Sequence, residues 1–448
     1  MTGNGAPGER RIRGSRHTVG DDGIPLLPKR REAGASFTGA VFNLSTNIVG
    51  AGIMALPACA KVLGVVPVFA MILLVAFLTD AAIELLLRFS RAGKTATYAG
   101  VMEDAFGRAG RVLLQVAVAM KIVGVMIIYM IIVGDVLSGK SSNGVHHHGI
   151  LEEWFGVHWW TGRFFVLLIT TLVVFLPLTS FKRIDSLKYT SAISVTLAVV
   201  FVVITVGIAV VKLLNGSISV ARMFPEIKDL ASFWNLFTVV PVIVTAYICH
   251  YNVHTINNEL EDSSQMKHVV QTSLALCSTI YIITSFFGFL LFGDDTLDDV
   301  LANFDFDLGI PYSSLVNDIV RVSYAIHLVL VFPIVFFALR LNVDGLIFPS
   351  ARPLSSNNRR FVLITVTLIS LVFLGANFIP NIWTAFQLTG ATAAACIGFI
   401  FPAAISLKDP HGIATRRDKL ISIVMIFLAV FANAVAVSSD VYSIFNDD

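Results

Sequence analysis

Two histidines, His250 and His254, are four residues apart in the stretch "TAYICHYNVHTINNEL". This spacing puts both imidazoles on one face of a helix, as in zinc enzymes with the pattern H-E-x-x-H. No glutamate lies between them, and Asn252 is neutral, so a metalloprotease would lack its general base. The other polar groups of the apolar segments 37–62 and 232–257 are amides and hydroxyls, with no acid/base or nucleophile arrangement. We therefore predict that the protein is not an enzyme and holds no cofactor or metal.

The stretch "STNIVGAGIMALP" contains helix-breaking residues within an apolar segment, residues 37–62, that is long enough to cross a bilayer. Glycine costs a helix about 1 kcal/mol and proline about 3 kcal/mol, so Gly50, Gly52 and Pro57 weaken its middle. In lipid, irregular backbone survives only where protein or a water-lined cavity satisfies its polar groups. The break is therefore a candidate binding site, and close packing of helices through small residues is the alternative.

A second interruption follows Pro241, where an apolar half-segment gives way to a polar one. Matched interruptions in two halves of a membrane protein indicate an inverted-repeat transporter with its substrate site near the midplane. Amides freed at such breaks suit a carboxylate, and freed carbonyls suit a cation or an ammonium group. Together these groups fit a zwitterion, which suggests an amino acid.

The composition requires a membrane protein, because 56% of the 448 residues are hydrophobic and only 14% are charged. Windows of about 20 apolar residues predict the transmembrane helices. There are eleven such segments: residues 37–62, 64–88, 112–137, 163–180, 188–212, 232–257, 268–292, 313–340, 360–378, 382–406 and 419–439.

The chain divides into a polar tail, residues 1–35, a membrane domain, residues 36–440, and a short end, residues 441–448. The tail is rich in Gly and Arg, has no apolar core and is predicted to be disordered. With eleven spans, 24 of the 32 Lys and Arg residues fall on the side of the tail and 6 on the other side. Because basic residues are enriched in cytoplasmic loops, we expect the amino terminus in the cytosol and the end 441–448 outside it.

The tail also contains "DDGIPLL", in which Asp22 precedes Leu26 and Leu27. An exposed acid followed by two leucines is a pattern that endosomal and vacuolar sorting adaptors bind, and a chance match has equal weight. The run His146 to His148 lies in a loop on the opposite side. It has metal-binding chemistry, but a solvated loop is favoured over a metal site.

Three stretches resemble one transporter family: "FNLSTNIVGAGIMALP", "TAYICHYN" and "RVSYAIHLVLVFPIVFFALR". They are similar to the amino acid/auxin permease family, especially to plant vacuolar amino acid transporters and their relatives, the sodium-coupled neutral amino acid transporters. The resemblance covers about residues 35 to 440. It implies an all-α fold of eleven helices with a leucine-transporter-type core, a 5+5 inverted repeat with helices 1 and 6 broken, that carries amino acids by alternating access.

By matching position, the resemblance also implies a substrate site at the two breaks. The residues of the first span are Asn43, Ser45, Thr46, Asn47, Gly50, Ala51 and Gly52, and those of the sixth are Tyr247, Ile248, Cys249 and His250.

The coupling ion is argued from the eighth span, where the sodium-coupled relatives have threonines. This chain has Val329, Leu330 and Val331 before Pro333, so side-chain oxygens for sodium are missing unless Ser323 or backbone carbonyls replace them. Proton coupling, or none, is therefore favoured over sodium. The candidate titrating groups are Lys121, His250 and His327, since histidine titrates near neutral pH and a charge within a membrane span is costly unless it has a function.

Two alternatives stay open beside a proton-coupled transporter. One is an amino-acid-sensing receptor (transceptor) of the same fold, and the other is a sodium symporter. The predicted partners are an amino acid, the proton, the lipid bilayer and a sorting adaptor, with no nucleic acid.

Overall fold

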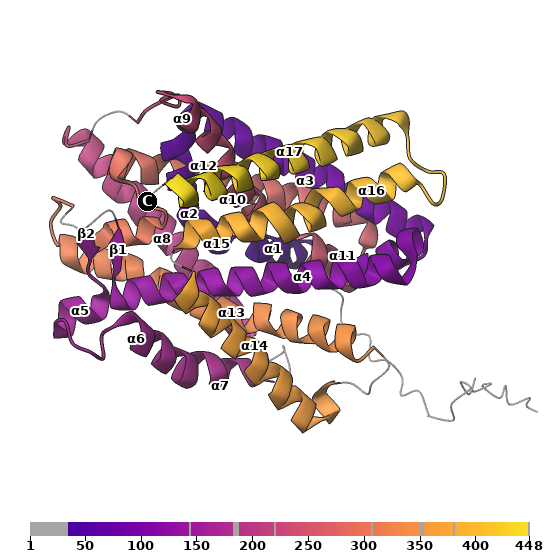
Figure 1. Cartoon of the computed structure of the whole chain (residues 1–448), viewed down its shortest axis with the longest axis horizontal. Helices are drawn as coiled ribbons and strands as arrows, with labels where there is room; N and C mark the ends of the chain where they lie inside the picture. Colours follow the sequence, from indigo (N-terminus) through magenta and orange to yellow (C-terminus); the bar gives the residue numbers. More distant parts are fainter. Residues whose placement is uncertain are drawn as a thin grey trace, which may run out of the picture.

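The computed structural model describes residues 35–142, 145–181, 188–218, 221–305, 308–349, 354–379 and 381–446. Asp22, Leu26, Leu27 and the last two residues lie outside this part of the chain. Figure 1 shows a bundle of long helices running roughly parallel to one axis. The fold is all-α apart from a short hairpin, in which β1 (Lys140–Ser142) pairs antiparallel with β2 (Val145–His147).

The first span is a broken helix. The side chain of Ser36 accepts a hydrogen bond from the amide of Gly39 and caps α1 (Phe37–Ile48). The chain then leaves the helical conformation at Val49 and resumes it as α2 (Gly52–Leu63), with a bend of 59° between the two halves. The break therefore falls at the glycines, where the sequence predicts it.

The other spans follow the apolar segments. Seven are single helices: α3 (Val65–Ala92), α4 (Tyr98–Ser138), α8 (Lys188–Leu214), α12 (Met266–Phe292), α13 (Ser313–Ile347), α14 (Asn358–Phe378) and α17 (Arg416–Asn446). The sixth is composed of α9 (Leu230–Asn235), η3 (Leu236–Thr238), α10 (Val239–Tyr247) and α11 (His250–Glu259). The tenth is composed of α15 (Ile382–Thr389), the π-helical turns η8 (Gly390–Ala394) and η9 (Cys396–Ile400), and α16 (Phe401–Lys408).

The described part of the chain contains nine helices that are long and apolar enough to span a membrane, and ten with the bent pair. The fourth predicted span corresponds to α6 (Arg163–Thr170), η1 (Thr171–Phe175) and α7 (Leu176–Thr179), which together form a shorter apolar helix. An eleventh crossing at this segment stays a prediction. The helix α4 also begins well before residue 112, because it continues through a kink at Gly107, whose φ of 66° is left-handed.

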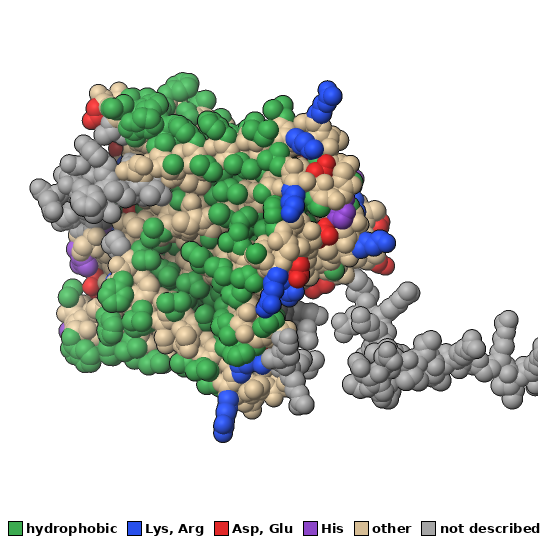
Figure 2. Space-filling view, turned by 45° about the vertical axis from the view of Figure 1, so that its right-hand side comes forward, with side chains coloured by type: hydrophobic (Ala, Val, Ile, Leu, Met, Phe, Trp, Pro, Cys, Tyr) green, Lys and Arg blue, Asp and Glu red, His purple; other side chains and the backbone are tan. Residues whose placement is uncertain are grey.

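The surface matches a bilayer. Figure 2 shows apolar side chains over the middle of the molecule and Lys and Arg side chains gathered at one end. We call this the basic end. In the chain, η4 (Ser263–Gln265) directly precedes α12 and η7 (Leu354–Ser356) precedes α14. The opposite end, the hairpin end, carries β1, β2, α5 (Ile150–Phe155), η5 (Gly293–Asp295) and η6 (Val300–Asp305). The chain is a multi-pass integral membrane protein.

The two broken spans lie side by side in the centre. The half-helix α10 packs directly on α2, and α12 packs along both α1 and α2. The helix α13 covers this centre from the other side and packs between α4 and α8. The bundle thus surrounds both breaks with helices, as irregular backbone at membrane depth requires.

Candidate functional site

At both breaks the first half-helix ends in the same backbone conformation, whereas the residues before the second half-helices, Ala51 and Cys249, differ in φ by 65° (−55° and −120°). Val49, which ends α1, and Ile248, which ends α10, both have a φ of −74° and a ψ of 100°. The second half-helices, α2 and α11, begin without a side-chain cap. The first N–H groups of a helix have no partner within it, and its N-terminus carries partial positive charge. In α2 the amides of Ile53 and Met54 already donate to carbonyls within the break, and in α11 the amide of Asn252 does so. The amides that suit a carboxylate are therefore those that begin each half-helix, at Gly52 and His250.

Tyrosine hydroxyls from neighbouring helices contact the carbonyls at both breaks. The hydroxyl oxygen of Tyr281 lies 2.7 Å from the carbonyl oxygen of Ile48 and 2.9 Å from that of Ala246. Tyr324 donates to the carbonyl of Gly50 at 2.8 Å. Because Tyr281 reaches a carbonyl of each broken span, it connects the two breaks directly.

Small residues let the half-helices approach each other closely. A Cβ atom added at Gly52 would lie 2.6 Å from the Cβ of Ala246 and 3.0 Å from its Cα. A Cβ added at Gly50 would lie 2.7 Å from the hydroxyl of Tyr129. At Gly52 the added atom would meet a Cβ and the backbone, so packing accounts for this glycine, which is the alternative that the sequence leaves open. At Gly50 it would meet only the end of the Tyr129 side chain.

The structure brings most of the predicted substrate residues together. The residues at the breaks are all buried: Gly50, Ala51, Gly52, Tyr247, Ile248, Cys249 and His250. Asn47 links the two spans, because its side-chain oxygen accepts from the amide of Asn252 at 2.6 Å. On the same helix Ser45 is buried, while Thr46 donates back to the carbonyl of Phe42. The side chain of Asn43 is exposed and lies apart from the rest.

Two of the three candidate coupling groups lie near the second break: His250 begins α11, and Lys121 belongs to α4. Lys121 is only 4% exposed, and its Nζ lies 3.3 Å from the hydroxyl of Tyr251 and 4.8 Å from the centre of that ring. His250, which precedes Tyr251 in the chain, is fully buried. Neither ring nitrogen of His250 or of His254 has a hydrogen-bond partner among the described residues. Unpaired buried imidazoles are costly, which makes this region a candidate for proton or substrate binding.

The third candidate, His327, lies on the other side of the breaks. Its Nδ1 is 2.7 Å from the carbonyl oxygen of Ser194 and 2.8 Å from the hydroxyl of the same residue. Its ring packs against Tyr324 with 4.9 Å between ring centres, and Tyr324 bonds to Gly50. His327 therefore contacts the first break through one intervening side chain.

Sequence reasoning missed the three tyrosines at the breaks: Tyr129, Tyr281 and Tyr324. The available signal was a tyrosine within an apolar span, because a buried phenolic hydroxyl needs a hydrogen-bond partner. Which carbonyl it would meet depends on the packing of distant segments.

Two adjacent broken helices in an otherwise continuous bundle define a transporter fold of the leucine-transporter type. In agreement, the structure superposes on that of Mhp1, a nucleobase-cation-symport-1 family transporter in a closed conformation, with a TM-score of 0.56 and 12% sequence identity. The match covers 90% of this chain and 92% of Mhp1.

Sequence comparison gives the family. The model of the family described as transmembrane amino acid transporter protein matches residues 33–443. The chain is 64% identical to amino acid transporter AVT6A of Arabidopsis thaliana, over 95% of this chain and 94% of the relative. It is 27% identical to a putative sodium-coupled neutral amino acid transporter 11 of Bos taurus, over 93% of this chain and 86% of that relative. The chain belongs to the amino acid/auxin permease family.

Proposed function

We propose that this protein is a secondary transporter that carries amino acids across a membrane by alternating access. The observation that carries this proposal is the pair of adjacent breaks, in which the first half-helices end in the same conformation and the second begin without a side-chain cap. The amides that begin α2 and α11 bind the substrate carboxylate. Its ammonium group is bound by break carbonyls other than those of Ile48, Gly50 and Ala246, which accept from tyrosines. Tyr247 and His250 flank the amino acid side chain.

Proton coupling is favoured over sodium by the contacts of α13. Sodium needs several oxygen ligands, and in this helix Val329 and Val331 supply none. The hydroxyl of Ser323 donates to the carbonyl of Val320 within its own helix. Tyr324 contributes a hydrogen-bond donor to the first break, at the carbonyl of Gly50, where a bound cation would need a ligand.

The titratable groups stand on both sides of the breaks. Lys121 and His250 lie at the second break, and His327 contacts the first break through Tyr324. We propose that one of these groups exchanges the coupled proton, because a charge change at a break alters the relative stability of the two open states.

The direct test is the uptake of labelled amino acids into proteoliposomes. A transporter accumulates label inside the vesicles, whereas a receptor of the same fold binds amino acid without flux. Saturable binding without uptake, across a panel of amino acids and with both gradients imposed, would favour the receptor.

The distribution of charge supports a cytosolic basic end. The vacuolar location is suggested by the family resemblance and by the acidic dileucine pattern of the tail. We expect the double substitution Leu26→Ala and Leu27→Ala to divert the protein to the cell surface, because both apolar anchors of the sorting motif disappear. Fluorescence microscopy of tagged protein measures this change, with Ile24→Ala in the same tail as a control. An unchanged distribution would show that the motif is a chance match.

At the hairpin end, Asp299 is fully buried, and burial raises its pKa from 3.8 to about 7, with Asp135 contributing. Its Oδ1 accepts from the amide of Leu301, and its Oδ2 has no hydrogen-bond partner in the described residues. Between pH 3.8 and about 7 the carboxyl group of Asp299 therefore keeps its proton in the folded protein and loses it in the unfolded chain. The contribution of this group to stability is complete below the unfolded pKa and is lost as the pH rises through about 7.

We therefore expect Asp299→Asn to be more stable than the wild type at pH 8 and to lose this advantage as the pH falls toward 5. Thermal unfolding of both proteins across this range measures the difference. Asp298→Asn, at the preceding residue, which is only partly buried, serves as the neighbouring comparison. If the unfolding temperatures of the wild type and Asp299→Asn changed in parallel with pH, the raised pKa of Asp299 would be contradicted.

A further inference from the structure

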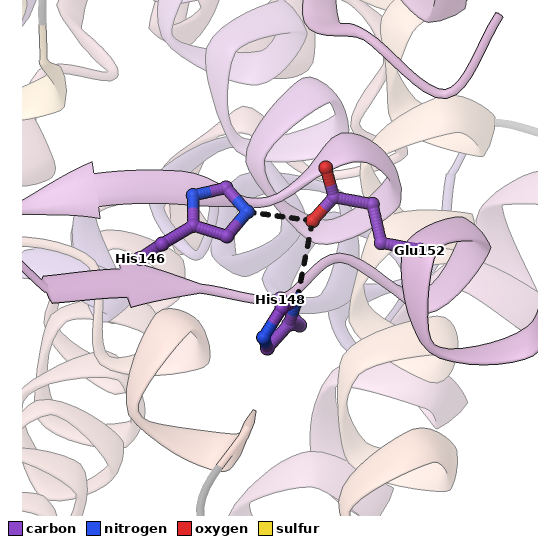
Figure 3. A group of neighbouring side chains, drawn as sticks. All are labelled: His146, His148 and Glu152. Atoms are coloured by element: carbon purple, nitrogen blue, oxygen red, sulfur yellow. Dashed lines mark hydrogen bonds and ion pairs between the residues drawn. The ribbon is translucent and has the colours of Figure 1, made fainter. Parts of the chain in front are cut away.

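The hairpin end carries a cluster of two histidines and one glutamate outside the transport site. His146 belongs to β2, His148 follows it, and Glu152 lies in the first turn of α5. Figure 3 shows both imidazoles directed toward the carboxylate. The Nε2 atom of His146 lies 2.8 Å from Oε2 of Glu152, and Nδ1 of His148 lies 3.6 Å from the same oxygen. One ligand atom from each residue falls within 4.8 Å of the others.

We propose that His146, His148 and Glu152 form a binding site for a divalent transition metal ion, zinc by preference. Two imidazoles and one carboxylate are a common set of three protein ligands for zinc, with water in the fourth position. Ligands about 2.0–2.1 Å from zinc in a tetrahedron are roughly 3.4 Å apart. The separations in the cluster bracket this value, so small side-chain rotations suffice to coordinate the ion.

The second nitrogen of His146 contacts a neighbouring strand and can orient the ring for an ion. Nδ1 lies 3.1 Å from the hydroxyl of Ser141 on the paired strand β1. When Nδ1 carries the hydrogen and donates it to Ser141, Nε2 presents a lone pair to the Glu152 oxygen. In the other tautomer Ser141 donates to Nδ1 and Nε2 donates to Glu152 at 2.8 Å, and a metal ion would displace that proton. A hydrogen bond from the outer nitrogen of a histidine to a neighbouring group is also typical of metal ligands.

The surrounding contacts hold the three ligands in place. The side chain of Glu152 is 6% exposed, and its Oε2 accepts from the amide of Gly149 at 3.4 Å. Arg321 donates to the backbone carbonyl of His148 at 2.8 Å. The charge of this arginine is balanced by ion pairs with Glu153 at 2.6 Å and Asp318 at 3.1 Å. It therefore braces the cluster without adding an uncompensated positive charge beside the metal.

The middle histidine of the run has a different role. His147 is buried, and its Nδ1 lies 3.0 Å from a carboxylate oxygen of Asp305 in η6. Alternation along the strand directs His146 and His147 to opposite faces. The run thus joins the hairpin to η6 through one histidine and leaves the other two available for the ion. Their side chains are 43% and 56% exposed, which gives an ion access from solution.

The test uses full-length protein from which any affinity tag has been removed, with Zn²⁺ as the probe. After equilibration with Zn²⁺ and dialysis, elemental analysis should give one zinc ion per wild-type chain, and the double variant His146→Ala, His148→Ala should retain none. In calorimetric titrations each single variant should weaken zinc binding by at least about tenfold, and Ser141→Ala by several-fold. His158→Ala is the matched control, because His158 is another histidine at this end and stacks on Trp160.

Two further readouts keep the result independent of transport and of folding. Co²⁺ bound by the wild type should give the visible absorption of a tetrahedral site, and Zn²⁺ should raise the unfolding temperature of the wild type but not of the double variant. Equal zinc content in the wild type and the double variant would overturn the proposal. So would the absence of zinc from the wild type, which would indicate that a proton alone joins His146 to Glu152.

Discussion

Collapsing the pH gradient across proteoliposomes should abolish the accumulation of labelled amino acid, whereas replacing sodium by choline should change uptake little. A gradient of one pH unit supplies about 1.4 kcal/mol per proton, enough for roughly tenfold accumulation with one proton per substrate. Uphill transport requires that the coupled ion bind differently in the two open states, so an ion that does not bind contributes nothing.

The expectation depends on what the protein places at its breaks. The helix α13 offers valines at 329 and 331 and a hydroxyl donor at Tyr324, which already bonds to the carbonyl of Gly50. At the other break Lys121 is buried, with Tyr251 as its contact. This environment favours a group that gains and loses a proton over one that binds sodium.

Lys121→Ala should therefore flatten the dependence of uptake on pH, as should His250→Ala if the histidine is the titrating group. The control is Lys408→Ala. Its Nζ lies 4.8 Å from the ring centre of Phe106, the same cation–π separation as for Lys121 and Tyr251, but near the end of α16. Strict sodium dependence, with indifference to the pH gradient, would contradict proton coupling and imply that amides and backbone carbonyls hold the ion.

The spans could be predicted from the sequence because hydropathy acts locally. Segments 188–212 and 268–292 fall within α8 and α12 and nearly reach their ends. The break at Gly50 and Gly52 was predictable for the same reason, since helix propensity is a property of neighbouring residues. The long α4 was not, because its first turns are held by contacts of Tyr98, whose hydroxyl bonds to the carbonyl of Ile397 in a distant span.

The candidate site was predictable only where a residue lies in a break. Tyr281 and Tyr324 belong to unbroken helices, and their hydroxyls meet carbonyls more than thirty residues away in the chain. The same limit applies to the histidine run. The sequence favoured a solvated loop for residues 146–148, because it does not show that the hairpin folds back onto Glu152.

Gly52→Ala should reduce transport strongly, and Gly52→Leu should abolish it, because α2 and α10 touch at this position. The added Cβ would lie 2.6 Å from the Cβ of Ala246, a distance that side-chain carbons do not adopt, so the half-helices must separate. Overpacking of this kind costs about 1–3 kcal/mol. At the breaks this separation would also displace the carbonyl of Ala246 from the hydroxyl of Tyr281, which reaches both spans.

The packing argument makes a compensating substitution possible. Ala246→Gly removes the Cβ that Gly52→Ala would meet, so the double variant should recover most of the uptake that the single variant loses. Only the contact with the Ala246 Cα, at 3.0 Å, stays tight. Gly207→Ala is the matched control, since a Cβ added at this membrane glycine of α8 meets nothing within 4 Å and should leave uptake unchanged.

Four proteins are compared: the wild type, Gly52→Ala, the double variant Gly52→Ala with Ala246→Gly, and Gly207→Ala. Their uptake, chromatographic behaviour and thermal unfolding separate packing from substrate contact at Gly52. If packing decides, the single variant is less stable and the double variant regains stability and uptake together. If the double variant is as stable as the wild type yet still fails to transport, the space beside the Cα of Gly52 is itself part of the substrate site. Full uptake by Gly52→Ala alone would contradict both explanations, packing and substrate contact. It would require α2 and α10 to separate without disturbing the breaks.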